Sequence, residues 1–364
     1  MAAPDDQLTL DDDTSQPFIN IKDEFKSPSG PTHIPLLTPP KSFVPPTIPP
    51  LSPLHSDILA EFRSYVDAGL AIPASFEPKS ACYDRAVAYC TTPCLRRYLT
   101  SHKWVLDSAK RGLHDTLLWR EEYRPDAITA EEVTSEAMAG NAYINGLDKE
   151  GRPILYIRKR GKLGNPELNI RLIIHILENA IRIMPEGVER VSMILDFTNY
   201  TRANSPPVSI SRTMMRFIIS HYPDRMGVAF FVNTPWVFGL LWNVIGHFLD
   251  PSTTANIHFV KHNHDKPLVD DTMETSISAT PKPIMEAKVN GSTPSLPTTT
   301  SSWSLFPFGK SSPNLTTENV TSTDGLRITS VISEDVLELG YGGTYNYVYN
   351  HIKYNEEFDK RMGR

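Results

Sequence analysis

One stretch constrains this chain more than any other: residues 226–249 contain no Asp, Glu, Lys or Arg. A helix of that length would be long enough to span a bilayer. However, an Asn-Thr-Pro sequence at 233–235 interrupts the stretch, and Asn243 and His247 follow it. Each of these residues is unfavourable in hydrocarbon. The sequence therefore favours a segment that is buried in a folded protein over a transmembrane helix.

The stretch divides into a strand, a turn and a helix. The continuous apolar run 227–232 is typical of a parallel strand that is covered on both faces. Pro235 suits the first turn of a helix, because its missing N–H has no partner there, so we expect a helix over 236–249. That helix is apolar on nearly every side. It is either a central core helix or a helix that rests on protein along one face and on other apolar material along the opposite face.

Composition limits the classes of function. The net charge is −6 and there is no long basic block, which argues against nucleic acid as the main partner. Cys82, Cys90 and Cys94 form neither a CxxC pair nor a zinc-ligand spacing, so we expect reduced structural thiols and no metal site. The acidic N-terminus lacks the basic and apolar regions of a secretory signal, which predicts a cytoplasmic protein.

The first part of the chain contains two segments. Residues 1–50 are rich in proline and have little hydrophobic periodicity, so we expect a disordered or polyproline leader. From Ser56 onward, apolar residues recur at helical spacing behind candidate capping residues. Residues 52–135 are therefore expected to form an all-helical N-terminal subdomain.

After Gly151 the pattern alternates between strands and helices. This alternation predicts a mostly parallel sheet with right-handed crossovers, and therefore an α/β fold. The predicted strands are 153–158, 191–197, 227–232 and 257–260, and the predicted helices are 166–184 and 207–220.

The last hundred residues begin with a low-complexity insertion. Residues 262–323 are rich in Pro, Ser, Thr and Asn and carry too little apolar area to offset the entropy of ordering. Order is expected to resume at Arg327, followed by a tail helix over 345–362. Four side chains of that helix are predicted to face inward: Tyr345, Val348, Ile352 and Phe358.

Motifs for catalysis are missing. The sequence has no GxSxG elbow, no HExxH and no GxGxxG after a strand. Residues 308–311 end like a phosphate-binding loop, but Ser304 stands where the first glycine belongs. We therefore expect no enzyme, no catalytic residue and no cofactor.

A series of short motifs occurs in a fixed order along the chain. They lie at 95–99, 103–104, 119–123, 151–154, 195–197, 222–226, 233–236, 248–251 and 337–343. Each motif is weak alone, but their order and spacing together are specific. The set resembles the CRAL-TRIO family, and more closely its fungal phosphatidylinositol/phosphatidylcholine transfer proteins.

The resemblance implies a CRAL-TRIO lipid-binding lobe, in which a mostly parallel sheet flanked by helices surrounds an apolar pocket. The lobe would comprise 138–261 and 324–350, with a C-terminal tail at 351–364. Residues 236–249 fall where the family has a mobile gate helix, which accounts for a helix that is apolar on both sides. The gate and acyl-pocket residues would be Trp236, Phe238, Leu240, Leu241, Trp242, Ile245, Phe248, Met214, Phe217 and Phe231.

The resemblance also implies a headgroup site. Asp224, Arg225 and Thr253 match positions of the polar network in inositol-lipid-binding members. Asn256 stands where those members have a lysine, which removes a point charge from a phosphate site although Asn still donates a hydrogen bond. Phosphatidylcholine, a sterol or another hydrophobe therefore remains open beside phosphatidylinositol. A structural ion pair is the alternative role for Asp224 and Arg225.

The expected function is lipid binding and exchange between membranes, with phosphatidylinositol and/or phosphatidylcholine as the bound ligand. A lipid-responsive scaffold that recruits partners without net transfer is the second hypothesis. The expected partners are a phospholipid and, transiently, a membrane surface, so we expect a cytoplasmic protein with peripheral membrane association. We expect a monomer that does not bind nucleic acid.

Overall fold

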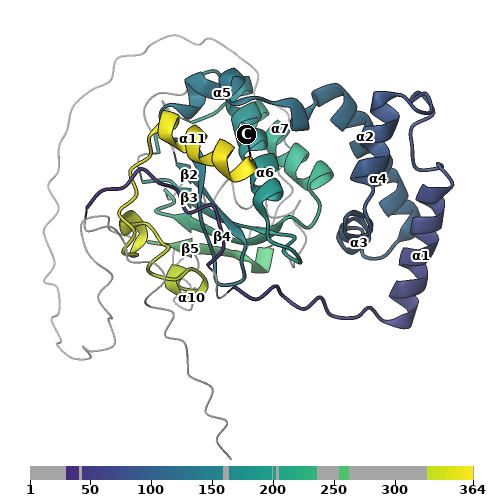
Figure 1. Ribbon diagram of the computed structural model, residues 1–364, viewed down its shortest axis with the longest axis horizontal. Helices are drawn as coiled ribbons and strands as arrows, with labels where there is room; N and C mark the ends of the chain where they lie inside the picture. The colour runs from purple at the N-terminus through teal and green to yellow at the C-terminus, as the bar shows by residue number, and fades with distance from the viewer. Residues whose placement is uncertain are drawn as a thin grey trace, which may run out of the picture. The chain divides into compact units, whose positions relative to one another are not determined.

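The computed structural model describes residues 30–40, 43–158, 164–198, 200–201, 205–235, 254–261 and 326–363 (Figure 1). Its helices are α1 (Pro53–Asp67), α2 (Ala81–Tyr89), α3 (Thr92–Ser101), α4 (Leu106–Tyr123), η2 (Pro125–Ala127), α5 (Ala130–Ala137), α6 (Pro166–Ile183), α7 (Val208–His221), α10 (Ile328–Val331), η6 (Leu339–Tyr341) and α11 (His351–Met362). Its strands are β1 (Ala142–Leu147), β2 (Pro153–Arg158), β3 (Val191–Asp196), β4 (Met226–Val232) and β5 (Ile257–Val260). None of the described helices is long and apolar enough to cross a bilayer.

The N-terminal helices begin at polar caps and enclose a core of their own. Ser52, Ser80 and Thr91 each accept a hydrogen bond from the backbone N–H three residues later, at the starts of α1, α2 and α3. Phe62 of α1 and Tyr98 of α3 are among the fully buried side chains of this core. This helical layer agrees with the prediction for the segment.

The five strands form one sheet in the order β1-β2-β3-β4-β5. Strands β2 to β5 are parallel, and β1 pairs antiparallel with β2. The prediction of a mostly parallel α/β sheet is confirmed. Helices α6 and α7 are the crossovers from β2 to β3 and from β3 to β4. Because both crossovers advance in the same direction across the sheet, right-handedness places both helices on one face.

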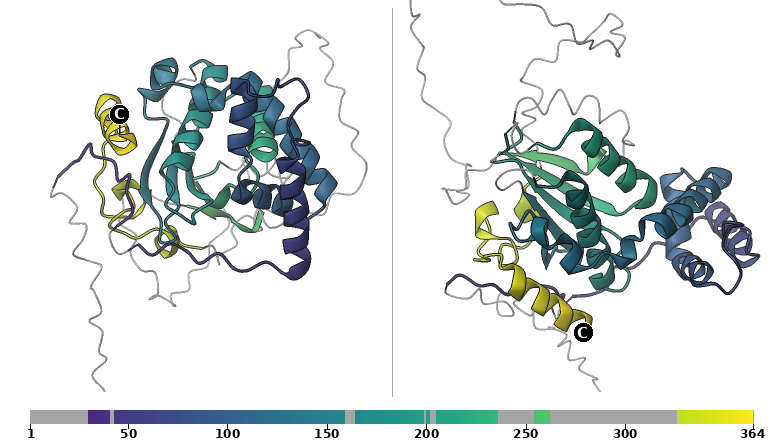
Figure 2. Two further views of the ribbon diagram at one scale, coloured as in Figure 1. Left: turned by 45° about the vertical axis from the view of Figure 1, so that its right-hand side comes forward. Right: turned by 90° about the horizontal axis from the view of Figure 1, so that it is seen from above.

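The other face of the sheet is covered by the C-terminal segment, as the right-hand view of Figure 2 shows. In-register neighbours share a face, so Tyr156, Ile194 and Phe230 lie together on this side. We call it the tyrosine face, because Tyr341 packs on Tyr156 with ring centroids 5.5 Å apart and donates a hydrogen bond to Asp196. The opposite side, which carries Leu155, Leu195 and Phe231, is called the helix face.

A buried carboxylate fixes the C-terminal segment to the sheet. Glu338 accepts hydrogen bonds from the hydroxyl of Tyr143, the amide of Asn145 and the guanidinium of Arg158, at 2.9 to 3.0 Å. Arg158 also lies over the ring of Tyr143, 4.7 Å from its centroid. A buried charge is tolerated only when it is paired and hydrogen-bonded, and this one is both.

The prediction of a disordered leader up to residue 50 is not met over its last part. The structure describes 30–40 and 43–50 as an extended strap along the lobe. Backbone hydrogen bonds join Thr32 to the 346–348 segment, and the carbonyl of Leu36 accepts from the N–H of Gly146. Proline lacks an N–H, but the residues between the prolines retain theirs, and these pair with the lobe while Leu37 is buried.

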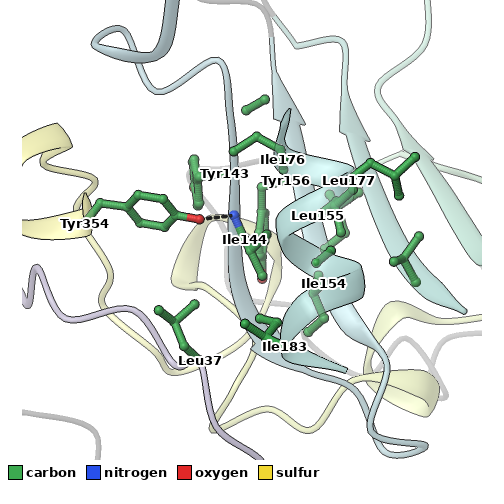
Figure 3. Close-up of a cluster of buried hydrophobic side chains, with 14 of the residues drawn as sticks. Leu37, Tyr143, Ile144, Ile154, Leu155, Tyr156, Ile176, Leu177, Ile183 and Tyr354 are labelled. Carbon is green, nitrogen blue, oxygen red and sulfur yellow. Dashed lines mark hydrogen bonds between the residues drawn. The ribbon is translucent and has the colours of Figure 1, made fainter. Parts of the chain in front are cut away.

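The tail helix starts later than the sequence pattern indicated. Helix α11 begins after the Asn350 cap, and Tyr354 and Phe358 supply its buried face. Val348 and Ile352, which were predicted to face inward, are 43% and 70% exposed. The hydroxyl of Tyr354 accepts a hydrogen bond from the N–H of Ile144 in β1. Ile144 belongs to the hydrophobic cluster of the lobe, which helix α6 also contacts (Figure 3).

The helical subdomain contacts the lobe through helix α4. Arg120 of α4 forms a bidentate pair with Glu178 of α6, which also accepts from the hydroxyl of Tyr222. Close by, Trp119 stacks on His221 at 4.2 Å, and His221 Nδ1 lies 3.0 Å from the hydroxyl of Thr116. The two parts are therefore joined by a largely buried ion pair and by an aromatic stack beside it.

We predict that Gly343→Ala destabilises the fold. A Cβ at this position would lie 1.8 Å from the carbonyl oxygen of Leu337, a backbone atom that moves only with the whole C-terminal segment. Overpacking of this kind costs about 1–3 kcal/mol or more, to be measured as a lower free energy of unfolding in denaturant. Gly30→Ala is the control, since a Cβ there meets nothing within 4 Å. Equal stability of the two variants would contradict the packing described.

We also predict a loss of stability in mild acid that depends on His221. Burial lowers the pKa of this imidazole to about 4, with Asp115 opposing the shift and Arg216 and Arg120 adding to it. A depressed histidine pKa means that the unfolded chain binds the proton first, so the stabilisation is present above pH ~6.5 and is lost as the pH falls toward 4. Unfolding free energies measured across this window should fall less steeply for His221→Gln.

Candidate functional site

The predicted site residues divide into those that the structure describes and those that it does not. Positions Trp236, Phe238, Leu240, Leu241, Trp242, Ile245, Phe248 and Thr253 lie outside the described residues, so the gate assignment stays a prediction. The described ones are Met214, Phe217, Phe231, Asp224, Arg225 and Asn256. They come from α7, from β4 and the turn before it, and from the residue before β5.

The helix face of the sheet is unevenly covered. Beneath α6, Ile144 of β1 and Leu155 of β2 are fully buried. Toward β3, β4 and β5 the same face carries apolar side chains that are only half-buried. These are Met193, Leu195, Phe231, Ile257 and Phe259, and we call them the floor. An apolar surface of this kind, left incompletely covered inside a folded lobe, is the usual lining of a ligand site.

Aromatic rings form the carboxyl-terminal end of the floor. Phe231 lies between Phe197 and Phe259, with ring centroids 5.9 and 5.5 Å away. The register explains the row: Phe231 of β4 pairs with Phe259 of β5, and Phe197 follows β3 two residues after Leu195 on the same face. Phe231, which the sequence predicted as a pocket residue, therefore lies in the middle of this aromatic row.

Helix α7 packs loosely: none of its own side chains whose burial is described is fully buried. Met214 and Phe217 are half-buried, and Ile219 is exposed. Phe217 also packs against α4, with its ring 5.3 Å from Trp119 and 5.0 Å from Tyr123. It thus belongs to the contact between the lobe and the helical subdomain as well as to the α7 surface.

Asp224 and Arg225 lie at the amino-terminal end of β4, and each pairs with a residue just before β3. Asp224 accepts from Arg190 at 2.6 Å, and Arg225 donates to the carbonyl of Glu189, also at 2.6 Å. Arg97 of α3 forms an ion pair with the same Glu189. Three arginines therefore surround two carboxylates, a net charge of +1 among these five side chains. We call this group the arginine cluster.

Burial shapes the electrostatics of the cluster. It raises the pKa of the Asp224 carboxyl, which Arg190 opposes, and it lowers the pKa of Arg225, to which Arg97 adds by repulsion. Two guanidinium groups held close together inside a protein favour an additional anion beside them. The cluster is built to hold negative charge, either the carboxylates alone or a further anionic group.

Asn256 lies at the same edge of the sheet as the arginine cluster. The carbonyl of Asn256 accepts from the N–H of Ala229, and Ile257 is in register with Ala229. Asn256 is therefore level with Val228 of β4. Arg225 lies three residues before Val228, which is about 10 Å along an extended strand. The two residues therefore share one end of the sheet, while the guanidinium of Arg225 is directed to Glu189 on the β3 side.

Arg97, Glu189 and Arg190 were not predicted from the sequence. Arg97 is part of the 95–99 motif, but an arginine on a helix is more often exposed, and its burial came only from the packing of α3 on the lobe. Glu189 and Arg190 precede β3 in a turn, and nothing in their spacing linked them to β4. The parallel pairing of β3 with β4 brings them together.

Comparison with known proteins supports the same assignment. Residues 137–281 match the model of the CRAL/TRIO domain. The chain is 32% identical over 170 residues to a CRAL-TRIO domain-containing protein of Schizosaccharomyces pombe, which covers 46% of this chain and 17% of the relative. It is 32% identical over 191 residues to the phosphatidylinositol transfer protein PDR17 of Saccharomyces cerevisiae, covering 48% and 54%.

Two further matches are more distant. The phosphatidylinositol transfer protein CSR1 of Eremothecium gossypii is 26% identical over 182 residues, covering 46% of this chain and 42% of the relative. The crystal structure of Sfh5 superposes with a TM-score of 0.46 at 15% identity, covering 58% of this chain and 82% of that one. The chain spans about half or less of the length of the curated relatives described here. The expectation from the sequence motifs is confirmed for this part of the chain: residues 137–281 match the CRAL/TRIO domain.

Proposed function

We propose that this chain binds one phospholipid molecule and exchanges it between membranes without catalysing a reaction. The floor carries the proposal, because its apolar side chains are only half-buried, whereas Tyr156, Ile194 and Phe230 on the other sheet face are fully buried. The arginine cluster supports it by offering net positive charge at one edge of the same sheet. The names of the relatives PDR17 and CSR1, both phosphatidylinositol transfer proteins, support the ligand class.

The energetics of the tails require an enclosed site. At ~0.8 kcal/mol per buried methylene, two acyl chains with about thirty methylenes would cost roughly 20–25 kcal/mol to expose to water. A carrier must therefore cover the tails in solution and open at a bilayer. We place the tails along the floor and against Met214 and Phe217 of α7. The predicted gate helix, 236–249, follows β4 directly and would supply the movable cover.

Phosphatidylinositol is the first ligand that we propose. Its phosphate would lie at the edge that carries the arginine cluster and Asn256, where Arg97, Arg190 and Arg225 offer more donors than Glu189 and Asp224 use. Phosphatidylcholine is the second. The choice between them depends on Asn256, since a lysine there would add the point charge that a phosphate prefers.

The proposal predicts that a charge on the floor displaces the lipid. In Phe231→Asp an unpaired carboxylate would face the acyl chains, so native mass spectrometry of the purified chain should show at least about a tenfold drop in bound phospholipid. Ile219→Asp on the exposed side of α7 is the matched control and should keep its lipid. Purification of the unaltered chain with no lipid bound would count against the whole proposal.

A second prediction concerns headgroup preference. Asn256→Lys should raise the ratio of phosphatidylinositol to phosphatidylcholine bound from mixed vesicles, by about tenfold if the new charge-assisted bond contributes ~1.4 kcal/mol. Asn256→Gln, which keeps the amide, is the control. No change in the ratio for the lysine variant would place the headgroup away from this edge.

Exchange and scaffolding differ in one measurement. A vesicle-to-vesicle transfer assay with labelled phosphatidylinositol should show movement of lipid that depends on the amount of protein added. A chain that holds phospholipid but transfers none would favour the lipid-responsive scaffold. Trp242→Asp, on the predicted gate, should abolish transfer while leaving the helical subdomain folded.

A further inference from the structure

We propose that the helical subdomain carries its own contact surface for the bilayer, at the turn between α3 and α4 and the start of α1. The surface comprises Ile48, Leu54, Lys103, Trp104 and Val105, and we call it the α3–α4 tip. It rests on the proposed function in one respect, because an exchange protein has to meet a membrane. Its residues are distinct from those of the floor, the arginine cluster and the predicted gate.

One ring pair brings these residues together. Trp104 stacks on His55 with ring centroids 3.9 Å apart and planes 5° from parallel. Leu54 immediately precedes His55, and Val105 immediately follows Trp104, so the stack brings these two chain positions into one region of the surface. On the strap, Ile48 adjoins Pro49, whose carbonyl accepts a hydrogen bond from Arg96 of α3 at 3.4 Å.

The aliphatic side chains of the tip face water. Leu54 is 67% exposed, Val105 54% and Ile48 52%. Single exposed aliphatic residues are common on protein surfaces and need no explanation. Here Leu54 and Val105 are the chain neighbours of His55 and Trp104 in the stacked ring pair, and Ile48 lies on the strap that is bonded to α3, so their exposure together marks a candidate interaction surface.

The backbone of the tip is in an uncommon conformation. Lys103 and Trp104 are consecutive left-handed residues, with φ of +53° and +61°, a region that non-glycine residues seldom occupy. The N–H of Trp104 donates to the carbonyl of Leu99 at 2.7 Å, which holds the turn. The result is that Lys103 and Val105 are exposed while the indole between them stays half-buried. Strained backbone of this kind persists where the surrounding contacts enforce it.

A bilayer fits the chemistry of the tip. The tip is formed by chain turns at helix ends, and it combines aliphatic side chains with a tryptophan and a lysine, the composition of membrane-interface anchors. Helices α1 and α4 both start here, so their positive dipole ends add to Lys103 and Arg96. Asp107, in the first turn of α4, offsets part of that charge. The balance favours a membrane with anionic lipid.

Vesicle flotation of the full chain tests the proposal. The probe is phosphatidylcholine vesicles with about one fifth phosphatidylserine. The double variant Leu54→Asp, Val105→Asp should bind these vesicles at least about tenfold more weakly, because two carboxylates would enter the interface. The matched control is Val87→Asp, Leu118→Asp, which alters two exposed aliphatic residues of the same subdomain on α2 and α4. It should bind like the unaltered chain.

Three outcomes would overturn the proposal: unchanged binding by the tip variant, an equal loss in the control variant, or no response of a probe at the tip. The probe is an environment-sensitive fluorophore on Val105→Cys in a Cys82→Ser background, chosen because Cys90 and Cys94 are buried. Its emission should shift to the blue on addition of vesicles. Native mass spectrometry of the same samples separates the two proposals, since a tip variant that keeps its phospholipid leaves the floor assignment intact.

Discussion

The lobe depends on one constraint: a mostly parallel sheet has two apolar faces, and both need cover. The tyrosine face is covered by the C-terminal segment, which Glu338 anchors through Tyr143, Asn145 and Arg158. The helix face is covered by the crossover helices, fully at β1 and at Leu155 of β2 and only partly at Met193, Leu195 and Phe231 farther across the sheet. The difference between the two faces explains why one lobe combines a rigid core with an apolar surface available to a ligand. It also explains why residues near both ends of the chain belong to the same unit.

Charged residues join the helical subdomain to the lobe at two places. Arg120 meets Glu178, and Arg97 shares Glu189 with Arg225. Removing these charged groups from water costs free energy. The pairs therefore fix the position of the subdomain on the lobe, and loss of either partner would leave a buried, unpaired charge. Arg225, which the family resemblance linked to a headgroup, takes part in the second of these contacts, and Asp224 lies next to it in an ion pair with Arg190. A headgroup phosphate at the arginine cluster would therefore contact the junction between the two parts.

The sequence predicted the parallel strands β2 to β5 but missed the antiparallel strand β1, and it predicted the surroundings of the sheet less well. Apolar runs such as 191–197 and 227–232 identified the strands, because burial on both faces leaves a continuous hydrophobic signal. The strap was missed, since proline content indicates disorder when neighbouring backbone partners are unknown. The inward face of α11 was assigned to the wrong residues, because the helix begins six residues later than its hydrophobic pattern suggested and its register follows the Asn350 cap.

The sequence by itself determined the fold class, the four parallel strands with the helices α6 and α7 between them, and the CRAL-TRIO resemblance, because these depend on local periodicity and on short motifs. Tertiary structure alone decided which side chains meet. The pairing of β3 with β4 brought Glu189 and Arg190 to Asp224 and Arg225, and the packing of α3 added Arg97. Contacts of this kind join residues far apart in the chain, and the physical reason they escape prediction is that hydrogen bonding and charge pairing depend on distance in space, which local patterns do not encode.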